Sequence, residues 1–389
     1  MKQYPDSSRF KFWREPYNIV LDTTTYCNAK CPQCSRINST EGAKLSFQGK
    51  VTKSLPLMHV PLEKIKNAFT PNVLKKINEI QFCPTWGDHM MHPHASEMVE
   101  YFLKSNNYVN VSINTNGSMR DELYWWKMCA LSVKHKSRSK ARRYRIIFDV
   151  DGINQEMHGL YRRNTNLQKV LNHMKIASEF KDHLRVSSQT VVFKHNQDYV
   201  KEIEELCKSY GSESHISVIS ERFESAQAEN GNTYYFYDEN NQKLTLEKVT
   251  PEWRLKFKKE GALTSRQPHA DMGEKPSCGW SLTNSLQINF DGNVWPCCYF
   301  GNSAIMKSKE WENHHEFIKK YYDYNNNIYE NDIENILNND WWQELPYMLE
   351  SNNLVKQCLR HCTNCVKDSQ LRLNKTLWIY NIDSYFCRF

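Results

Sequence analysis

The sequence predicts an α/β fold built on a parallel sheet. Short apolar runs with strand character recur through the first two thirds of the 389-residue chain, and amphipathic segments with helical spacing separate them. The predicted strands cover residues 18–24, 79–83, 109–115, 145–150, 185–193 and 215–219. The predicted helices cover residues 61–69, 95–105, 121–131, 166–180 and 198–210. Such β-then-α units give a doubly wound sheet or a partial barrel, whose ligands bind at the carboxyl ends of the strands.

The composition is that of a globular protein with a large core, at 40% apolar and 13% aromatic residues. The first twenty residues contain no apolar signal segment, and no run has the length of a membrane span, so we expect a cytoplasmic protein without membrane association. Thirteen cysteines in such a chain indicate thiolate ligation rather than disulfides. The net charge of +7 includes a basic run at residues 134–145, which we expect on a solvated face at the amino ends of the strands.

Three cysteines follow the first predicted strand directly. Cys27, Cys31 and Cys34 have the spacing C-x3-C-x2-C, and their position puts the loop at the ligand-binding end of the sheet. A structural zinc usually takes four protein ligands and disulfides need pairs, so three thiols suit neither. They suit a cubane iron–sulfur cluster with one iron left open for a ligand that is not protein.

This loop, placed after the first strand of a series of β-α units, resembles the radical S-adenosylmethionine (SAM) superfamily. The resemblance implies a partial (β/α)6 TIM-like barrel in which the three thiolates bind a [4Fe–4S] cluster and SAM binds the fourth iron. Gln33 stands where many members have an aromatic residue before the last cysteine. Segments at later strand ends also resemble the superfamily, and with the loop they extend the likeness over residues 18–220.

The SAM contacts that the resemblance implies lie in these later segments. Trp86, Gly87 and Asp88 replace a Gly-Gly-Glu-Pro type segment, with Asp88 as acceptor for the SAM amino group. Asn116 belongs to a Thr-Asn-Gly turn. In the segment after the fourth strand, Asp149 is the expected ligand of the ribose hydroxyls, and Arg162 is expected to reach the SAM carboxylate or a substrate anion. Cys83, at the end of the second strand, is a candidate hydrogen donor to a substrate radical, with a buried structural thiol as the alternative.

A second domain is expected in the last third of the chain. Residues 1–220 form the barrel, residues 221–275 are expected as an extended connection, and residues 276–389 form a small α+β domain with a hairpin at 285–300. Cys278 and Cys297 flank Gly292 with the spacing C-x13-G-x4-C, and a later C-x2-C follows at Cys362 and Cys365. This pattern resembles the Twitch domain, a truncated form of the SPASM domain, and implies an auxiliary [4Fe–4S] cluster. Either Cys358 or Cys298 could replace one of these ligands, and a zinc knuckle is the alternative.

The resemblance implies an enzyme that cleaves SAM reductively to a 5′-deoxyadenosyl radical and abstracts hydrogen from a substrate C–H bond. The expected net reaction is oxidation or dehydrogenation of a small molecule or carbohydrate, with the auxiliary cluster as electron acceptor and a flavodoxin or ferredoxin-type protein as electron donor. A peptide-modifying enzyme, either an epimerase or a cross-linking maturase, is the alternative within this class. The alternative outside it is a zinc or iron–sulfur protein that holds nucleic acid through the basic run, which the segments at the strand ends disfavour.

Overall fold

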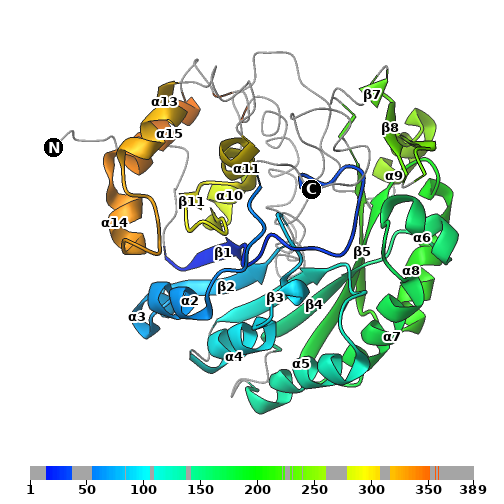
Figure 1. Ribbon diagram of the computed structural model, residues 1–389, viewed down its shortest axis with the longest axis horizontal. Coiled ribbons are helices and arrows are strands. Elements are labelled where there is room, and N and C mark those ends of the chain that lie inside the picture. Colours follow the sequence, from blue (N-terminus) through cyan, green and yellow to red (C-terminus); the bar gives the residue numbers. More distant parts are fainter. Residues whose placement is uncertain are drawn as a thin grey trace.

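A curved sheet of eight strands, in the order β11-β10-β1-β2-β3-β4-β5-β6, forms the centre of the protein (Figure 1). The computed structural model describes residues 15–36, 55–83, 85–105, 109–136, 142–220, 222–223, 228–229, 231–238, 240–259, 278–306, 316–350, 355 and 358. Strands β1 to β6 pair in parallel and in chain order. Their bounds are β1 (Tyr17–Leu21), β2 (Ile77–Phe82), β3 (Asn110–Thr115), β4 (Tyr144–Asp149), β5 (Leu184–Val192) and β6 (Ser214–Ile219). All six expected strands are present, and the partial barrel is confirmed.

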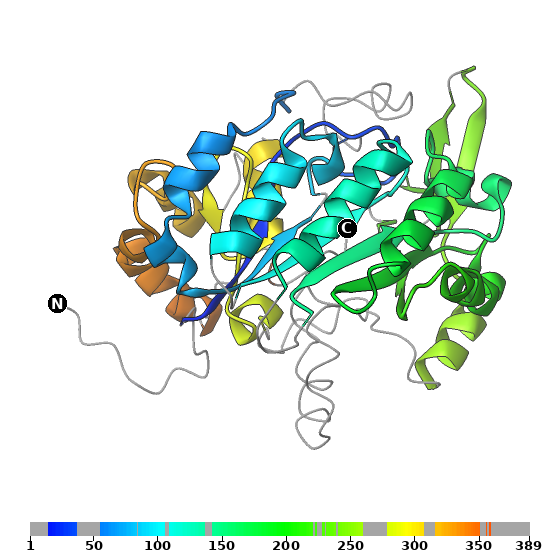
Figure 2. The same cartoon turned by 90° about the horizontal axis from the view of Figure 1, so that it is seen from below.

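Helices cover the outer face of this curved sheet, as the two perpendicular views show (Figures 1 and 2). Phe102 and Trp125, from two of these helices, share one buried core with strand residues such as Ile80. Asp121 and Asn166 fix two helix starts by accepting an N–H three residues further on. The helices are α2 (Leu62–Ala68), α3 (Pro71–Leu74), α4 (Ala95–Ser105), α5 (Glu122–Lys134), α6 (Gln155–Tyr161), α7 (Leu167–Ser178) and α8 (Val200–Ser209), with 3₁₀ turns η1 (His89–Met91) and η2 (Gln197–Tyr199).

The segment after β6 corrects one expectation, because it is not an extended connection throughout. It contains the antiparallel strands β7 (Ala228–Glu229), β8 (Thr233–Tyr237) and β9 (Lys243–Glu247), followed by helix α9 (Pro251–Lys259). Tyr234, Phe236 and Leu246 alternate with more exposed residues and are buried in a cluster that includes Cys31. This small sheet therefore packs against the cysteine loop.

The C-terminal hairpin is confirmed, and it joins the barrel sheet. Strand β10 (Ser285–Ile288) pairs in parallel with β1, and β11 (Val294–Trp295) pairs antiparallel with β10. Gly292 turns the hairpin at φ +89°, and a Cβ there would lie 2.3 Å from the Tyr329 ring. Strand β10, which follows the domain boundary expected at residue 276, therefore belongs to the barrel sheet.

The remaining described elements lie beside this hairpin in Figure 1. They are α10 (Gly279–Leu282), α11 (Cys298–Met306), α13 (Glu316–Lys319), η3 (Lys320–Asp323), α14 (Ile333–Asn338) and α15 (Asp340–Glu350). They pack on the hairpin through aromatic residues: the ring of Tyr321 in η3 stacks on that of Trp295 in β11, with 3.6 Å between centroids. Within the described ranges, no helix is both long enough and apolar enough to cross a membrane.

Candidate functional site

The cysteine loop follows β1 and is held by backbone hydrogen bonds, one to the segment after α6 and one within the loop. Lys30 N donates to Arg163 O at 2.9 Å, and Cys34 N donates to Cys31 O at 3.0 Å. Cys31 is buried, while Cys27 and Cys34 are partly buried against the same apolar cluster. The three thiols expected to act together therefore sit on one fixed loop at the carboxyl end of the sheet.

Gln33, the departure from the superfamily pattern, has a clear structural role. Its side chain is fully buried; its Oε1 accepts from Ser220 Oγ at 2.6 Å, and its Nε2 donates to Arg222 O at 2.9 Å. These bonds tie the loop to the end of β6. Tyr234 OH adds a bond to Pro32 O at 2.8 Å. An amide replaces the usual aromatic residue here because its partners are polar groups of the strand end and the connection.

Two of the thiols contact N–H donors from other strand ends. Asn116 Nδ2 lies 3.7 Å from Cys27 Sγ, and Arg162 Nη1 lies 3.8 Å from Cys31 Sγ. Burial raises the pKa of both thiols, that of Cys31 to about 12, and the Arg162 charge opposes the rise at Cys31. Donors and positive charge beside sulfur are what a thiolate or a cluster sulfur needs in a buried site.

The three thiols of the loop suit a cubane cluster with one iron left open for a ligand that is not protein. In the described part of the chain, no group of three or more His, Cys, Asp or Glu side chains is arranged to hold a metal ion. A cubane distributes its thiolates over separate irons, which suits three cysteines spread along one loop with N–H donors beside two of them.

Gly87 allows the loop after β2 to lie against the cysteine loop. A Cβ at this position would lie 2.3 Å from Thr24 O and 2.7 Å from Tyr26 O, and both are backbone atoms. The neighbouring Asp88 N donates to Tyr26 O at 2.9 Å. Only glycine permits this approach, so the segment expected to receive SAM is packed directly on the segment expected to hold the cluster.

Asp88 is buried and engaged within the protein. Its carboxylate accepts from Thr115 Oγ1 at 2.9 Å, from Asn116 N at 2.9 Å and from Asn116 Nδ2 at 2.7 Å. Met90 N adds a fourth donor at 3.0 Å. Burial still raises the pKa of this carboxyl. Asp88 thus joins the ends of β2 and β3 and orients Asn116 toward Cys27; its contact with a SAM amino group stays a prediction.

Asp149 and Arg162 lie together, as expected of two residues at one site, and Asp151 completes the group. Arg162 Nη1 pairs with Asp149 Oδ2 at 2.9 Å, and Arg162 Nε pairs with Asp151 Oδ2 at 2.5 Å. Both carboxylates are almost fully buried. Burial raises the pKa of Asp149 to about 6, against the opposing effect of Arg162. Gln189 Nε2 also donates to Asp149 at 2.5 Å.

The C-terminal cysteines that the structure describes are all buried. Cys278 directly precedes α10, Cys297 directly precedes α11, and Cys298 and Cys358 are buried in the same core cluster. The positive end of the nine-residue helix α11 lies next to Cys297, which favours a thiolate there. The other two expected auxiliary ligands, Cys362 and Cys365, lie outside the described residues.

Sequence reasoning missed several buried polar residues at this end of the sheet. Asp22, Asp151 and Gln287 are at most 1% exposed, and none was among the expected site residues. In the sequence they are polar residues inside or next to otherwise apolar strand runs, such as "SLQINF", a pattern that solvent-facing strand residues share. Cys83 is buried at the end of β2 and is disulfide-bonded in this structure, which corrects the expectation of thiolates alone. A disulfide sulfur carries no S–H, so the predicted role of Cys83 as hydrogen donor would require its reduced form.

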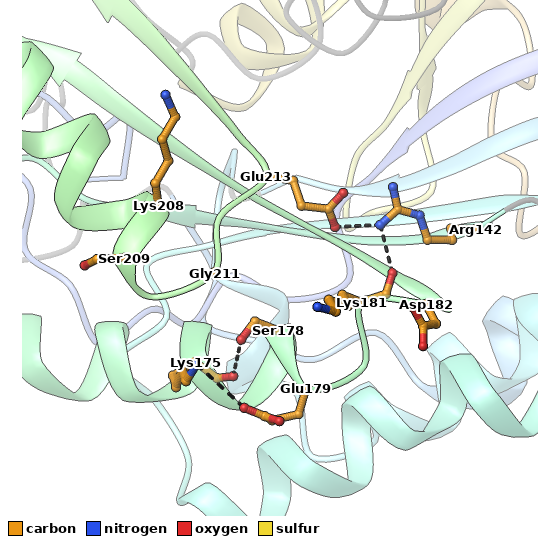
Figure 3. A pocket seen from close by; sticks show the side chains of 10 residues that line it. All are labelled: Arg142, Lys175, Ser178, Glu179, Lys181, Asp182, Lys208, Ser209, Gly211 and Glu213. Atoms are coloured by element: carbon orange, nitrogen blue, oxygen red, sulfur yellow. Dashed lines mark hydrogen bonds and ion pairs between the residues drawn. The ribbon is translucent and has the colours of Figure 1, made fainter.

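A pocket of about 770 Å³ lies at the opposite end of the sheet (Figure 3). It is formed around the ends of α7 and α8 and the segments that precede β4 to β6. Arg142, from the basic run, pairs there with Glu213 at 2.6 Å and donates to Lys181 O at 2.9 Å. Lysines and carboxylates line the opening. The solvated face expected for the run is present only in part: Lys134 and Lys136 are exposed, but Arg143 and Arg145 are buried. Residues 137–141 of the run lie outside the described residues.

Comparisons with known proteins agree with this fold. Residues 278–366 match the SPASM family, an iron–sulfur cluster-binding domain. No curated protein sequence matches the chain significantly. Native anSMEcpe with bound AdoMet and Kp18Cys peptide has a similar structure, with TM-score 0.51, 14% identity, and coverage of 86% of this chain and 84% of that one.

SuiB from Streptococcus suis has a similar fold in two solved structures. Bound to S-adenosylmethionine it gives TM-score 0.53 and 10% identity over 86% of this chain and 68% of that chain. Bound to precursor peptide SuiA it gives TM-score 0.52 and 10% identity over 85% and 67%. The shared fold and the SPASM match confirm the resemblance read from the cysteine motifs, for the architecture of the barrel and for an iron–sulfur domain at its C-terminal side.

Proposed function

We propose that this chain, which combines the radical SAM fold with a SPASM iron–sulfur domain, is an enzyme that abstracts hydrogen from a substrate C–H bond. When bound, a [4Fe–4S] cluster with SAM supplies a 5′-deoxyadenosyl radical by reductive cleavage, and an auxiliary cluster supplies an electron acceptor. The observation that carries the proposal is the arrangement of the cysteine loop against the ends of β2, β3 and β4.

Cys27, Cys31 and Cys34 would hold the first cluster. Asn116 and Arg162 direct N–H groups at two of these sulfurs, at 3.7 and 3.8 Å, which lowers the energetic cost of burying anionic thiolates. The strands β7–β9 cover this loop from the other side through Tyr234 and its apolar neighbours. Exclusion of water on that side would protect a reactive radical from side reactions.

SAM would bind along the strand ends beside this loop. We infer that Trp86, Gly87, Asp88, Asn116, Asp149 and Arg162 line its place. Because the Asp88 carboxylate already accepts four hydrogen bonds, we assign it mainly to positioning, and backbone groups of the Gly87 segment are then the groups available to SAM. Asp149 keeps free acceptor capacity for ribose hydroxyls, since a carboxylate has about four acceptor sites.

We propose net oxidation or dehydrogenation of a small molecule or carbohydrate, with Cys278 and Cys297 holding part of the auxiliary cluster and a flavodoxin or ferredoxin-type protein donating electrons. A peptide substrate is the second candidate, because the similar structures include anSMEcpe with Kp18Cys peptide and SuiB with precursor peptide SuiA. Cys278→Ala and Cys297→Ala variants test the acceptor role once a substrate is known. Net oxidation that persists without the auxiliary cluster would contradict it.

The test of the proposed function is SAM binding and cleavage by anaerobically reconstituted protein. Iron and sulfide analysis should give about eight irons per chain if each of two clusters is a cubane. The Cys27→Ala, Cys31→Ala and Cys34→Ala triple variant should lose about half of this iron and all SAM cleavage. A colourless protein that contains zinc would contradict the proposal.

A further inference from the structure

The inner face of the barrel sheet is polar, in contrast to its outer face. Residues that pair across parallel strands point to the same face of a sheet. Val20 of β1 is in register with Gln81 of β2 on one side and with Gln287 of β10 on the other. Gln81 continues in register with Ser112 of β3. The amide side chains of Gln81 and Gln287 therefore flank β1 on the face that the outer helices do not cover.

Asp22 lies on this same face, two residues beyond Val20. Its Oδ2 accepts from Gln287 Nε2 at 2.6 Å, and its Oδ1 accepts from Trp86 N at the long distance of 3.4 Å. The side chain is 1% exposed. Among the residues that the structure describes, no ion pair involves Asp22. Burial raises the pKa of this carboxyl well above its usual range.

Polar side-chain atoms without hydrogen-bond partners lie on the strands and the loop next to Asp22. Gln81 Oε1 and Gln287 Oε1 are both buried acceptors that receive no hydrogen bond, and the Trp86 indole N–H is a buried donor that makes none. The orientation of the Gln287 amide follows from its Nε2 bond to Asp22, so its Oε1 must be the unpaired atom. Buried polar groups are normally paired, because each unpaired one costs about 1–3 kcal/mol. The two unpaired amide oxygens, on the strands that flank β1, and the buried Asp22 carboxyl group indicate a place for a ligand that donates hydrogen bonds.

The chemistry of these atoms selects the ligand. They offer a carboxylate and two amide oxygens as acceptors, from three adjacent strand positions. An ammonium group has three N–H donors and one positive charge, which matches this set in number and in sign. We propose that Asp22, Gln81 and Gln287 form a subsite for a primary ammonium group of the substrate. This inference rests on the proposed function, because the Trp86 segment beside Asp22 is also expected to contact SAM.

The experiment measures binding of matched probe pairs to the reconstituted full-length protein by equilibrium dialysis. Glucosamine is compared with glucose, and Nα-acetyl-lysine amide with Nα-acetyl-norleucine amide. Each pair differs by the ammonium group, and the two pairs represent an amino sugar and a peptide side chain as its source. Wild-type protein should prefer the ammonium probe of at least one pair by about tenfold, the value expected for one charge-assisted hydrogen bond.

Variants separate the subsite from general electrostatics. Asp22→Asn keeps an acceptor for Gln287 but removes the charge, and it should reduce the preference to about one. Gln81→Met removes one unpaired acceptor without touching the bond between Asp22 and Gln287, and it should weaken ammonium binding about threefold or more. Asp182→Asn is the control, because this exposed carboxylate lies in the pocket at the other end of the sheet (Figure 3) and its loss should leave the preference unchanged.

The outcomes distinguish the two proposals when SAM binding is measured on the same samples. SAM binding without any ammonium preference, or with a preference that survives in Asp22→Asn, would overturn this inference alone. An ammonium preference without SAM binding would overturn the proposed function and leave the Asp22 subsite standing. A preference in one pair only would identify the source of the ammonium group.

Discussion

Arg162 is the group whose removal should disturb the site most. It is the cation paired with two buried carboxylates, those of Asp149 and Asp151, at 2.9 and 2.5 Å. Removal of one partner from a buried ion pair typically costs 3–5 kcal/mol, because the remaining charge stays desolvated. We therefore expect Arg162→Met to lower the free energy of unfolding by about 3–5 kcal/mol at pH 8, measured by urea unfolding of reconstituted protein.

The loss should depend on pH with a defined sign. The pKa of Asp149 is raised to about 6 even with Arg162 present, and loss of the opposing charge raises it further. A carboxyl whose folded-state pKa exceeds its unfolded value of about 3.9 contributes stability at low pH and loses it as pH rises through the folded pKa. Arg162→Met should therefore be closer to wild type at pH 6 than at pH 8.

The matched control is the neighbouring arginine. Arg163 is half-buried, and its guanidinium lies 5.4 Å from the centre of the Phe236 ring. Such a contact contributes about 0.5–1 kcal/mol, so Arg163→Met should cost no more than that. Asp149→Asn added to Arg162→Met should recover part of the loss, because it removes one of the unpaired charges. A loss below about 1 kcal/mol for Arg162→Met, or one that neither pH nor Asp149→Asn changes, would refute the reasoning.

Three further predictions concern the packing at Gly87, the buried His92 and the auxiliary ligand Cys297. Gly87→Ala should reduce the iron bound by the cysteine loop, because the added Cβ would lie 2.3 Å from Thr24 O. Gly159→Ala is the control and should keep the iron, because the nearest atom to its Cβ is a side-chain atom at 3.4 Å. Equal iron contents in the two variants would contradict this prediction. His92 is buried with its pKa lowered to about 4, so its contribution to stability is present above pH 6.5 and is lost as pH falls toward 4. His92→Gln should remove about 2 kcal/mol from the fall in unfolding free energy between pH 7.5 and pH 5, and unchanged pH dependence would argue against it. Cys297→Ala should lower total iron by about four per chain and leave SAM cleavage intact, and loss of both would show that the two centres are not independent.

The features that could be predicted from the sequence are local. Each barrel strand is a short apolar run, and the helices between strands have apolar residues at helical spacing. The order of elements can therefore be read from residues that are neighbours in the sequence. The cysteine loop is equally local, since Cys27 and Cys34 are seven positions apart. The strand-end segments could be placed on one side because parallel strands all end at the same edge.

The features that could not be predicted depend on distant pairing. Gln287 bonds to Asp22 from 265 positions away, because β10 joins the barrel sheet beside β1. A polar residue in a strand has the same pattern whether it faces water or a buried interior, so Asp22 could not be recognised as a site residue. The sheet of β7–β9 was not predicted because its short run of alternating apolar residues, around Tyr234 and Phe236, lies among polar turns. The surface that buries these apolar residues is the cysteine loop, which is distant in the sequence.

The central claim is that the cysteine loop and the strand ends bind a cluster and SAM for radical formation. The most direct measurement is the yield of 5′-deoxyadenosine from SAM after anaerobic reconstitution and chemical reduction, with wild-type protein beside the Cys27→Ala, Cys31→Ala and Cys34→Ala triple variant. We predict that wild type forms 5′-deoxyadenosine and that the triple variant forms none while keeping its auxiliary iron. Equal yields from the two proteins, or no yield from wild type that contains about eight irons per chain, would contradict the claim.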